Sequence, residues 1–291
     1  MHRFNQLRQG MSRDYHREGR PLSPLLSRII LTAEEENRHI LRVSDFKDFY
    51  HTTDSNARTM ISHLVAMGWL VRVGRGVYQL QPAKTGLDPY PTADKFVVSG
   101  QFAADSFIAY GSAAEYHGLT TQLFQNVLLA TTRRRNQMFL PKLKIQLILI
   151  DPINFVGFQK ITKAPDVSVA TIERTLIDAI NRPELCGGIS DVREILIRAR
   201  SKTNIDRIME YLPTYRSKSL IQRVGYLLDT FGFNLKPTDK ERLLSWCQGS
   251  KAYLFKRRQS DPTPEHRYSK DWRVVINASG FFPEQAQGEQ R

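Results

Sequence analysis

The segment from Val43 to Gln81 limits the possible folds of this chain more than any other part of its sequence. Apolar residues recur at helical spacing over 44–50, where Ser44 is a suitable N-cap, and again over 54–67 after a short polar turn. Gly68 follows the second run, in the position where a glycine commonly ends a helix. The pattern predicts two helices joined by a tight turn.

Two short strands are expected after the second helix. Residues 69–73 and 77–81 are rich in β-branched and aromatic side chains, and Gly74, Arg75 and Gly76 between them predict a three-residue hairpin loop. Helix, turn, helix and hairpin in this order are typical of a winged helix-turn-helix, whose second helix has the size of the DNA major groove. The sequence therefore predicts a DNA-binding domain.

The polar side chains of the second helix and of the hairpin are the predicted DNA contacts. Asparagine and arginine can read adenine and guanine through paired hydrogen bonds, while serine and threonine hold phosphates. The two arginines of the hairpin stand near two glycines, so their guanidinium groups can approach a phosphate closely. A solvated helix face without a ligand has a similar composition and remains an alternative. The predicted contacts are Ser55, Asn56, Arg58, Thr59, Ser62, His63, Arg72 and Arg75.

The net charge of the 291-residue chain is +13 at pH 7, which favours a polyanionic partner, nucleic acid first and an acidic membrane surface second. Most of this charge lies outside the predicted winged helix. Residues 133–163 carry seven Lys and Arg against one Asp, and residues 198–224 carry seven against two acidic side chains. Arg133, Arg134 and Arg135 are therefore candidates for an additional contact with nucleic acid or with an acidic partner protein.

The sequence contains no run of about 20 apolar residues, the length that a membrane span needs. Its arginine-rich N-terminus lacks the apolar core of a signal peptide. The two cysteines, Cys186 and Cys247, do not have CxxC spacing. These absences predict a cytoplasmic protein without a membrane partner, a disulfide framework or a zinc site.

A chain of this length is expected to form two domains. Residues 1–22 are polar and basic and predict a flexible arm, although Met11 is an alternative start. Residues 23–82 are assigned to the winged helix-turn-helix, and residues 83–91, with their prolines and glycine, to a linker. Residues 92–291 then form a larger mixed α/β domain with a C-terminal helical part. The predicted fold class is α+β.

Hydrophobic periodicity places alternating elements in the second domain. Short helices are predicted over 96–102 and 112–117, and longer helices over 171–181, 189–199, 205–212 and 219–231. Strands of a mixed sheet are predicted over 107–110, 127–131, 145–150 and 156–161, with a last strand over 272–277.

The second domain contains no complete set of catalytic side chains. The Gly-Ser pair within 110–112 is similar to a turn of nucleotidyltransferases, but that chemistry also needs two carboxylates one residue apart to hold metal. The candidate strand ends at a single carboxylate, Asp151. His117 has no Ser or Cys partner, and Arg174 and Asp178 have the i, i+4 spacing of a structural ion pair. The sequence therefore predicts no enzyme, no metal site and no cofactor.

Four segments have the order and spacing of one known family over roughly residues 23–277. They are GWLVRVGRGVY at 68–78, SAAEYHGL at 112–119, VATIERTLID at 169–178 and QRVGYLL at 222–228. The first is common among winged helices, whereas the joint occurrence of all four is far more specific. Together they resemble the AbiEi family of antitoxins from type IV toxin–antitoxin systems.

The resemblance implies a prokaryotic transcriptional autorepressor whose winged helix binds double-stranded DNA at inverted repeats in its own promoter. It also implies that the C-terminal domain counteracts a nucleotidyltransferase-like toxin, generally without a stable complex between the two proteins. A homodimer or cooperative binding is expected to fill two half-sites. The residues leave two alternatives open: a nucleic-acid-processing enzyme that the winged helix delivers to DNA or RNA, and an adaptor that uses the winged helix for protein contact.

Overall fold

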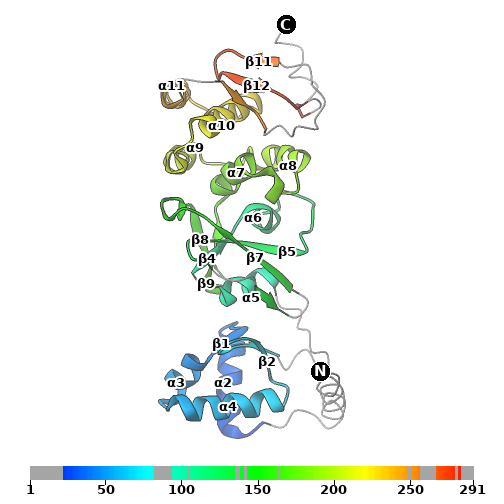
Figure 1. Ribbon diagram of the computed structural model, residues 1–291, viewed down its shortest axis with the longest axis vertical. Coiled ribbons are helices and arrows are strands. Elements are labelled where there is room, and N and C mark those ends of the chain that lie inside the picture. Colours follow the sequence, from blue (N-terminus) through cyan, green and yellow to red (C-terminus); the bar gives the residue numbers. More distant parts are fainter. Residues whose placement is uncertain are drawn as a thin grey trace. The chain divides into compact units, whose positions relative to one another are not determined.

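The computed structural model describes residues 22–81, 94–103, 105–134, 138–140, 143–162, 164–247, 251–255, 267–278 and 281–282. They fall into two compact units. The first lies within Met1–Ala104, Phe139–Lys144 and Lys160–Val167, and the second within Asp105–Met138, Ile145–Gln159 and Ser168–Arg291. The predicted linker over 83–91, the predicted arm except Leu22, and Arg135 lie outside the described residues. Helices and strands both contribute to the fold, which confirms the α+β class (Figure 1).

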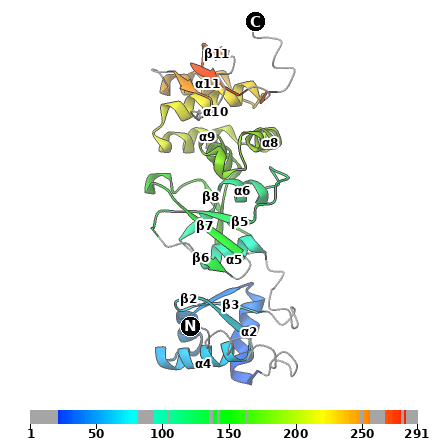
Figure 2. The same cartoon turned by 45° about the vertical axis from the view of Figure 1, so that its right-hand side comes forward.

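The N-terminal part of the first unit contains three helices and a three-stranded sheet. The helices are α2 (Pro24–Glu35), α3 (Val43–Tyr50) and α4 (Asp54–Ala66), and the strands are β1 (Ile40–Arg42), β2 (Leu70–Gly74) and β3 (Val77–Leu80). The strand order is β1-β3-β2, and both pairs are antiparallel. Figure 2 shows α4 on one side of this sheet. The element order is that of the predicted winged helix-turn-helix.

Side-chain caps fix where these helices begin. The Ser23 hydroxyl accepts a hydrogen bond from Leu26 N at 3.3 Å, and the Thr53 hydroxyl accepts one from Asn56 N at the same distance. The predicted N-cap at Ser44 is wrong. The N-cap is Arg42 and helix α3 begins at Val43, because the Asp45 carboxylate accepts a hydrogen bond from Arg42 N at 2.6 Å and thereby satisfies a free N–H group before the first turn.

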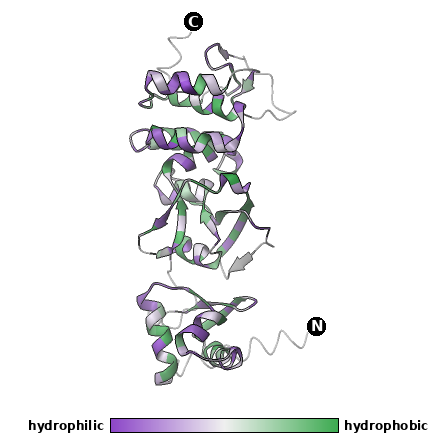
Figure 3. Ribbon diagram, turned by 90° about the vertical axis from the view of Figure 1, so that its left-hand side faces the viewer, coloured by the Kyte–Doolittle hydropathy of each residue, from purple (hydrophilic) through white to green (hydrophobic). Residues whose placement is uncertain are grey.

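The three helices pack their apolar faces together and against the sheet. Each helix carries both hydrophobic and hydrophilic residues, coloured green and purple in Figure 3, as expected when one face lies in a core. Burial of a leucine, isoleucine or phenylalanine side chain contributes about 1.5–3 kcal/mol to folding. The most deeply buried members of this core are Ile30, Leu41, Phe46, Ala57, Leu64, Leu70 and Leu80.

The hairpin loop is shorter than predicted. Gly74 pairs with Val77, so the loop consists of Arg75 and Gly76 alone. The register shifts between Arg72 and Gly74, which marks a β-bulge, and Gly76 has a φ of +70° that favours glycine. The bulge accounts for the difference, because it adds a residue to one strand without lengthening the loop.

Helix α5 (Lys95–Phe102) also belongs to the first unit and supplies hydrogen bonds to the edge strand β1. The Gln101 amide oxygen accepts hydrogen bonds from His39 N at 2.6 Å and Ile40 N at 3.3 Å. Its amide nitrogen donates to Asn37 O at 2.8 Å. One buried side chain thus satisfies three backbone groups at the start of β1.

A six-stranded sheet has the order β6-β7-β5-β4-β9-β8. Strand β4 pairs antiparallel with β5 and parallel with β9, which confirms the predicted mixed sheet. Strands β6 and β9 were not among the sequence predictions. The strands are β4 (Ser106–Ile108), β5 (Asn126–Thr131), β6 (Met138–Leu140), β7 (Leu143–Leu149), β8 (Phe158–Ile161) and β9 (Ala164–Ala170).

Helices predominate in the C-terminal half of the chain. The predicted helices occur as α6 (Tyr110–Tyr116), α7 (Ile172–Asn181), α8 (Ile189–Ala199), α9 (Ile205–Tyr211) and α10 (Lys218–Thr230). Helix α11 (Pro237–Trp246) was not predicted. A small sheet of β10 (Ala252–Tyr253), β12 (Val274–Ile276) and β11 (Arg267–Ser269) follows, of which only β12 was predicted. Among the helices described here, none is long and apolar enough to cross a membrane.

Candidate nucleic-acid interface

Helix α4 has one buried face and one exposed polar face. Ala57, Ile61 and Leu64 recur at helical spacing and are buried in the core of the winged helix. The polar side chains between them therefore point away from the core. All six predicted contacts on this helix are exposed: Ser55, Asn56, Arg58, Thr59, Ser62 and His63.

Two of these side chains make short-range hydrogen bonds that fix their orientation. The Asn56 amide nitrogen donates to the Thr52 hydroxyl at 3.2 Å, and the Thr59 hydroxyl donates to Ser55 O at 3.1 Å. An Asn side chain that donates once still has an acceptor oxygen and a second N–H group. The helix thus presents Asn56 in a defined position with capacity left for a base edge.

Arg58 forms an ion pair at the start of α4. Its Nε atom lies 2.6 Å from Asp54 Oδ2, and Lys47 Nζ lies 3.8 Å from Asp54 Oδ1. The hydrogen bond from Arg58 is the main reason why the pKa of Asp54 lies below its ordinary value. One carboxylate therefore holds two cations on the surface where the sequence predicts DNA contacts.

The hairpin presents the other two predicted contacts. Arg72 and Arg75 are both exposed, and Arg72 Nε donates to Gly74 O at 3.3 Å across the bulge. Arg75 stands in the two-residue loop, next to the side-chain-free Gly76. Two guanidinium groups at a hairpin tip are suited to phosphate oxygens, which accept two parallel hydrogen bonds from arginine.

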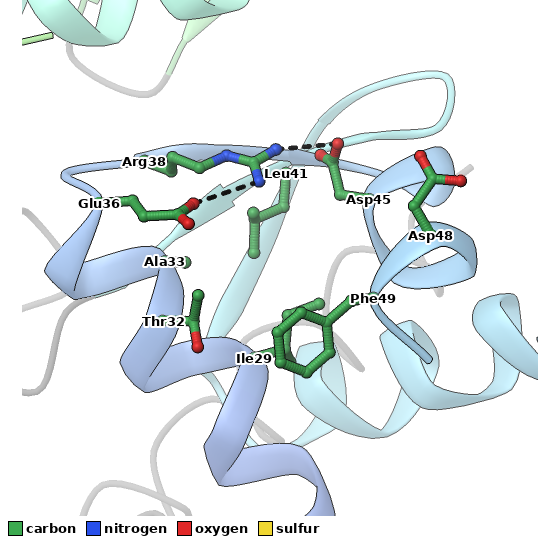
Figure 4. A pocket seen from close by; sticks show the side chains of 9 residues that line it. All are labelled: Ile29, Thr32, Ala33, Glu36, Arg38, Leu41, Asp45, Asp48 and Phe49. Carbon is green, nitrogen blue, oxygen red and sulfur yellow. Dashed lines mark ion pairs between the residues drawn. The ribbon is translucent and has the colours of Figure 1, made fainter. Parts of the chain in front are cut away.

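A pocket of about 160 Å³ lies between α2, β1 and α3 of the same domain (Figure 4). Three carboxylates and one guanidinium surround an apolar base that includes Ile29 and Phe49. Arg38 bridges two of the carboxylates, at 3.5 Å from Glu36 and 2.9 Å from Asp45. The excess of negative charge disfavours phosphate at this pocket, in contrast to the hairpin with its two arginines.

The residues that suggested nucleotidyltransferase chemistry have structural roles in the second unit. The buried Ser112 hydroxyl accepts a hydrogen bond from Leu128 N at 2.9 Å and donates to Asn126 O at 3.3 Å. Asp151 caps a short 3₁₀ turn by accepting a hydrogen bond from Ile153 N at 3.0 Å. Both side chains therefore make hydrogen bonds within the second unit.

His117 is also a structural residue. Its Nε2 atom lies 2.6 Å from the carbonyl oxygen of Ala170, which requires the ring nitrogen to be the donor. Burial lowers the pKa of His117, since the low-dielectric surroundings penalise the charged imidazolium. The ring therefore links α6 to the end of β9.

The predicted Arg174–Asp178 pair on α7 is buried and belongs to a larger network. Arg174 Nε lies 2.8 Å from Asp178 Oδ2, and both side chains are 1% exposed. Arg174 Nη1 donates to Val156 O at 2.9 Å, and the Tyr215 hydroxyl donates to the other oxygen of Asp178. Burial raises the pKa of Asp178, while the charge of Arg174 acts in the opposite direction. The helical spacing indicates the pair, but not Tyr215 from a distant part of the chain.

Of the three arginines predicted to make an additional contact, the structure describes Arg133 and Arg134. Arg133 and Arg134 are exposed, and Arg133 Nε lies 3.3 Å from Asp105 Oδ2. A surface ion pair of this kind is weak enough to exchange for a phosphate. A role for these arginines in binding stays a prediction.

Comparison with known proteins identifies the N-terminal segment. Residues 29–81 match a protein family described as "Transcriptional regulator, AbiEi antitoxin". The match covers most of α2, the three strands of the first sheet, α3 and α4. No curated protein matches the chain. Residues 29–81, which form this winged helix, are therefore similar to the AbiEi antitoxin family of transcriptional regulators.

Proposed function

We propose that this protein is a DNA-binding transcriptional autorepressor and the antitoxin of a type IV toxin–antitoxin system. The observation that carries the proposal is the exposure of all eight predicted DNA contacts on α4 and the hairpin of an AbiEi-family winged helix. In this proposal α4 enters the major groove, where Asn56 and Arg58 reach base edges. Arg72 and Arg75 hold the flanking phosphates.

Repression in this proposal requires two copies of the protein on inverted repeats in its own promoter. A twofold-symmetric operator mirrors a pair of proteins, bound either as a homodimer or cooperatively. Arg133 and Arg134, together with Arg135, are candidates for further phosphate contacts that raise affinity and its salt dependence.

The antitoxin part of the proposal rests on the second unit. The partner is a nucleotidyltransferase-like toxin, and neutralisation proceeds without a stable complex, as the family resemblance implies. The structural hydrogen bonds of Ser112 and Asp151 favour an antitoxin over a second nucleotidyltransferase, because both side chains that suggested the enzyme have protein partners.

A separation of the two activities tests the proposal. The full chain is expressed with a reporter under its own promoter and, in a second strain, with the toxin from the neighbouring reading frame. Arg72→Ala with Arg75→Ala is expected to lose repression and to keep growth rescue, since the arginines lie on the hairpin and not in the second unit. The exposed Arg28→Ala in α2 serves as a control for the loss of a cation outside the hairpin. Undiminished repression by the hairpin variant contradicts the proposal, and so does wild-type protein that fails to rescue growth.

A further inference from the structure

The outer face of the small C-terminal sheet carries two exposed tyrosines. Strand β10 runs parallel to the central strand β12, and β11 runs antiparallel to it. Val275 on β12 is the register partner of both Tyr253 on β10 and Tyr268 on β11. The three side chains therefore form one row across the sheet. Tyr253 is 50% exposed and Tyr268 is 41% exposed.

The opposite face of this sheet is buried. Ala252, Val274 and Ile276 alternate with the tyrosine row and lie in the core of the second unit. Helix α10 packs against β10 and β12, as the yellow and red elements near the C-terminus of Figure 1 show. The core of the second unit thus lies on the inner face of the sheet, opposite the row that contains the two tyrosines.

Positive charge accompanies the two rings. Lys251 Nζ lies 5.0 Å from the centre of the Tyr268 ring, a cation–π contact across the outer face. The described segments 251–255 and 267–278 carry a formal surplus of three positive charges. Four exposed cations, Lys251, Arg267, Lys270 and Arg273, stand against one exposed anion, Asp271.

We infer that this outer face, defined by Tyr253, Val275, Tyr268 and Lys251, binds single-stranded nucleic acid. Aromatic rings on a sheet surface stack on unpaired bases, and neighbouring Lys or Arg side chains neutralise the phosphates. Strands β10 and β11 are separated by β12, so their backbones lie about 10 Å apart, which leaves room for a separate base on each ring. A duplex hides the base faces that the rings would contact.

This inference goes beyond the proposed recognition of the operator. It concerns residues of the second unit, whereas operator binding is assigned to α4 and the hairpin of the first. It also depends on stacking of bases on the tyrosine rings, whereas operator recognition depends on contacts with base edges in the major groove. Failure of either proposal therefore leaves the other standing.

Binding of short labelled oligonucleotides to the full chain tests the inference. Fluorescence anisotropy is measured with oligouridine and with oligothymidine of about 12 nucleotides, which distinguishes an RNA from a DNA ligand. Tyr253→Leu with Tyr268→Leu keeps apolar area but removes both rings. Affinity is expected to fall at least about fivefold for each ring. Tyr253→Phe with Tyr268→Phe keeps the rings and is expected to bind within about twofold of the wild type.

Two controls separate stacking from general effects. Lys251→Ala is expected to weaken binding, and Lys202→Ala, which removes an exposed cation elsewhere in the second unit, is expected to weaken it less. The urea midpoint shows that each variant is folded. Three results overturn the inference: no binding of either oligonucleotide by the wild type, equal affinities of the wild type and the leucine variant, or equal losses in the leucine and phenylalanine variants.

Discussion

Arg58 and Asp54 form an ion pair on the exposed face of α4, with 2.6 Å between Arg58 Nε and Asp54 Oδ2. The other carboxylate oxygen, Asp54 Oδ1, lies 3.8 Å from Lys47 Nζ. The phosphates of a DNA duplex at this place would repel Asp54, and Arg58 would have to leave this carboxylate to reach a base edge. The pair therefore makes binding of any duplex weaker than the number of cations on α4 suggests.

Asp54→Asn is expected to tighten binding to duplexes without the operator sequence. The substitution frees both cations and removes one negative charge next to the phosphates, so we expect an increase of about threefold or more at low salt, and a smaller increase at high salt. The measurement is anisotropy of a labelled random-sequence duplex over a salt series. Asp48→Asn in α3 makes the same change of charge at an exposed site without a described ion pair to Arg58. An equal gain in both variants would mean that only the net charge matters.

The buried network around Arg174 predicts a large loss of stability when one partner is removed. Asp178→Asn leaves the guanidinium buried without its counter-charge, and we expect the free energy of unfolding to fall by about 3–5 kcal/mol. Urea denaturation followed by circular dichroism measures this quantity. The control is Glu184→Gln, which breaks the more exposed pair with Arg182 and should cost less than about 1 kcal/mol. Comparable losses in the two variants would show that the α7 pair is not a buried charge in solution.

The half-buried histidines His39 and His117 predict a dependence of stability on pH. Burial places the pKa of His117 and of His39 below the ordinary value of 6.5 in the folded state. As pH falls through 6.5, the unfolded chain takes up protons first, so the free energy of unfolding decreases. The slope is at most about 1.4 kcal/mol per pH unit for each histidine.

His117→Gln tests this origin of the pH dependence. The glutamine amide can donate a hydrogen bond as the ring does to Ala170 O, but it does not titrate. Urea denaturation between pH 5 and 7.5 should therefore give a shallower slope for the variant. A slope identical to that of the wild type would exclude His117 as a source.

Replacement of Gly225, in the middle of α10, by alanine is expected to destabilise the protein, although alanine favours helix formation more than glycine does. Alanine normally stabilises a helix interior relative to glycine by about 0.5–1 kcal/mol. A Cβ atom at Gly225 would lie 2.0 Å from Cζ3 of the buried Trp272, so we expect Gly225→Ala to destabilise the protein by about 1–3 kcal/mol. In a Trp272→Ala background the same substitution should be neutral or stabilising. Thermal or urea unfolding of the four proteins gives the answer, and additive effects would contradict the clash.

Local patterns in the sequence determine most of the first unit. Helical spacing and caps such as Thr53 identify α4 and the residues it exposes, because these are interactions between neighbours in the chain. The bulge between Arg72 and Gly74 was missed, since it depends on how two strands align rather than on the residues of the loop. The hydrogen bonds from Gln101 to the backbone at the start of β1 were missed for a similar reason, because Gln101 lies about 60 residues away from this strand in the sequence.

The second unit shows where sequence patterns stop being informative. The predictions found α7 and α10, whose apolar stripes are long, but missed α11, with one buried residue, and the short strands β10 and β11. A strand of two or three residues has too little periodicity to be recognised alone. The row that joins Tyr253 to Tyr268 exists only after both strands pair with β12.

Salt-dependent binding of the operator duplex tests the central claim most directly. The affinity of the wild type and of Arg72→Ala with Arg75→Ala is measured by anisotropy from about 50 to 300 mM salt, around the range where phosphate contacts dominate. If the hairpin arginines hold phosphates, the variant binds about 10–30-fold more weakly near 0.15 M salt. In a plot of log affinity against log salt concentration, the slope of the variant is also shallower by about 2, because about one unit of slope is lost with each phosphate contact. Equal affinities and equal slopes for the two proteins would contradict the account of α4 and the hairpin as the DNA-binding surface.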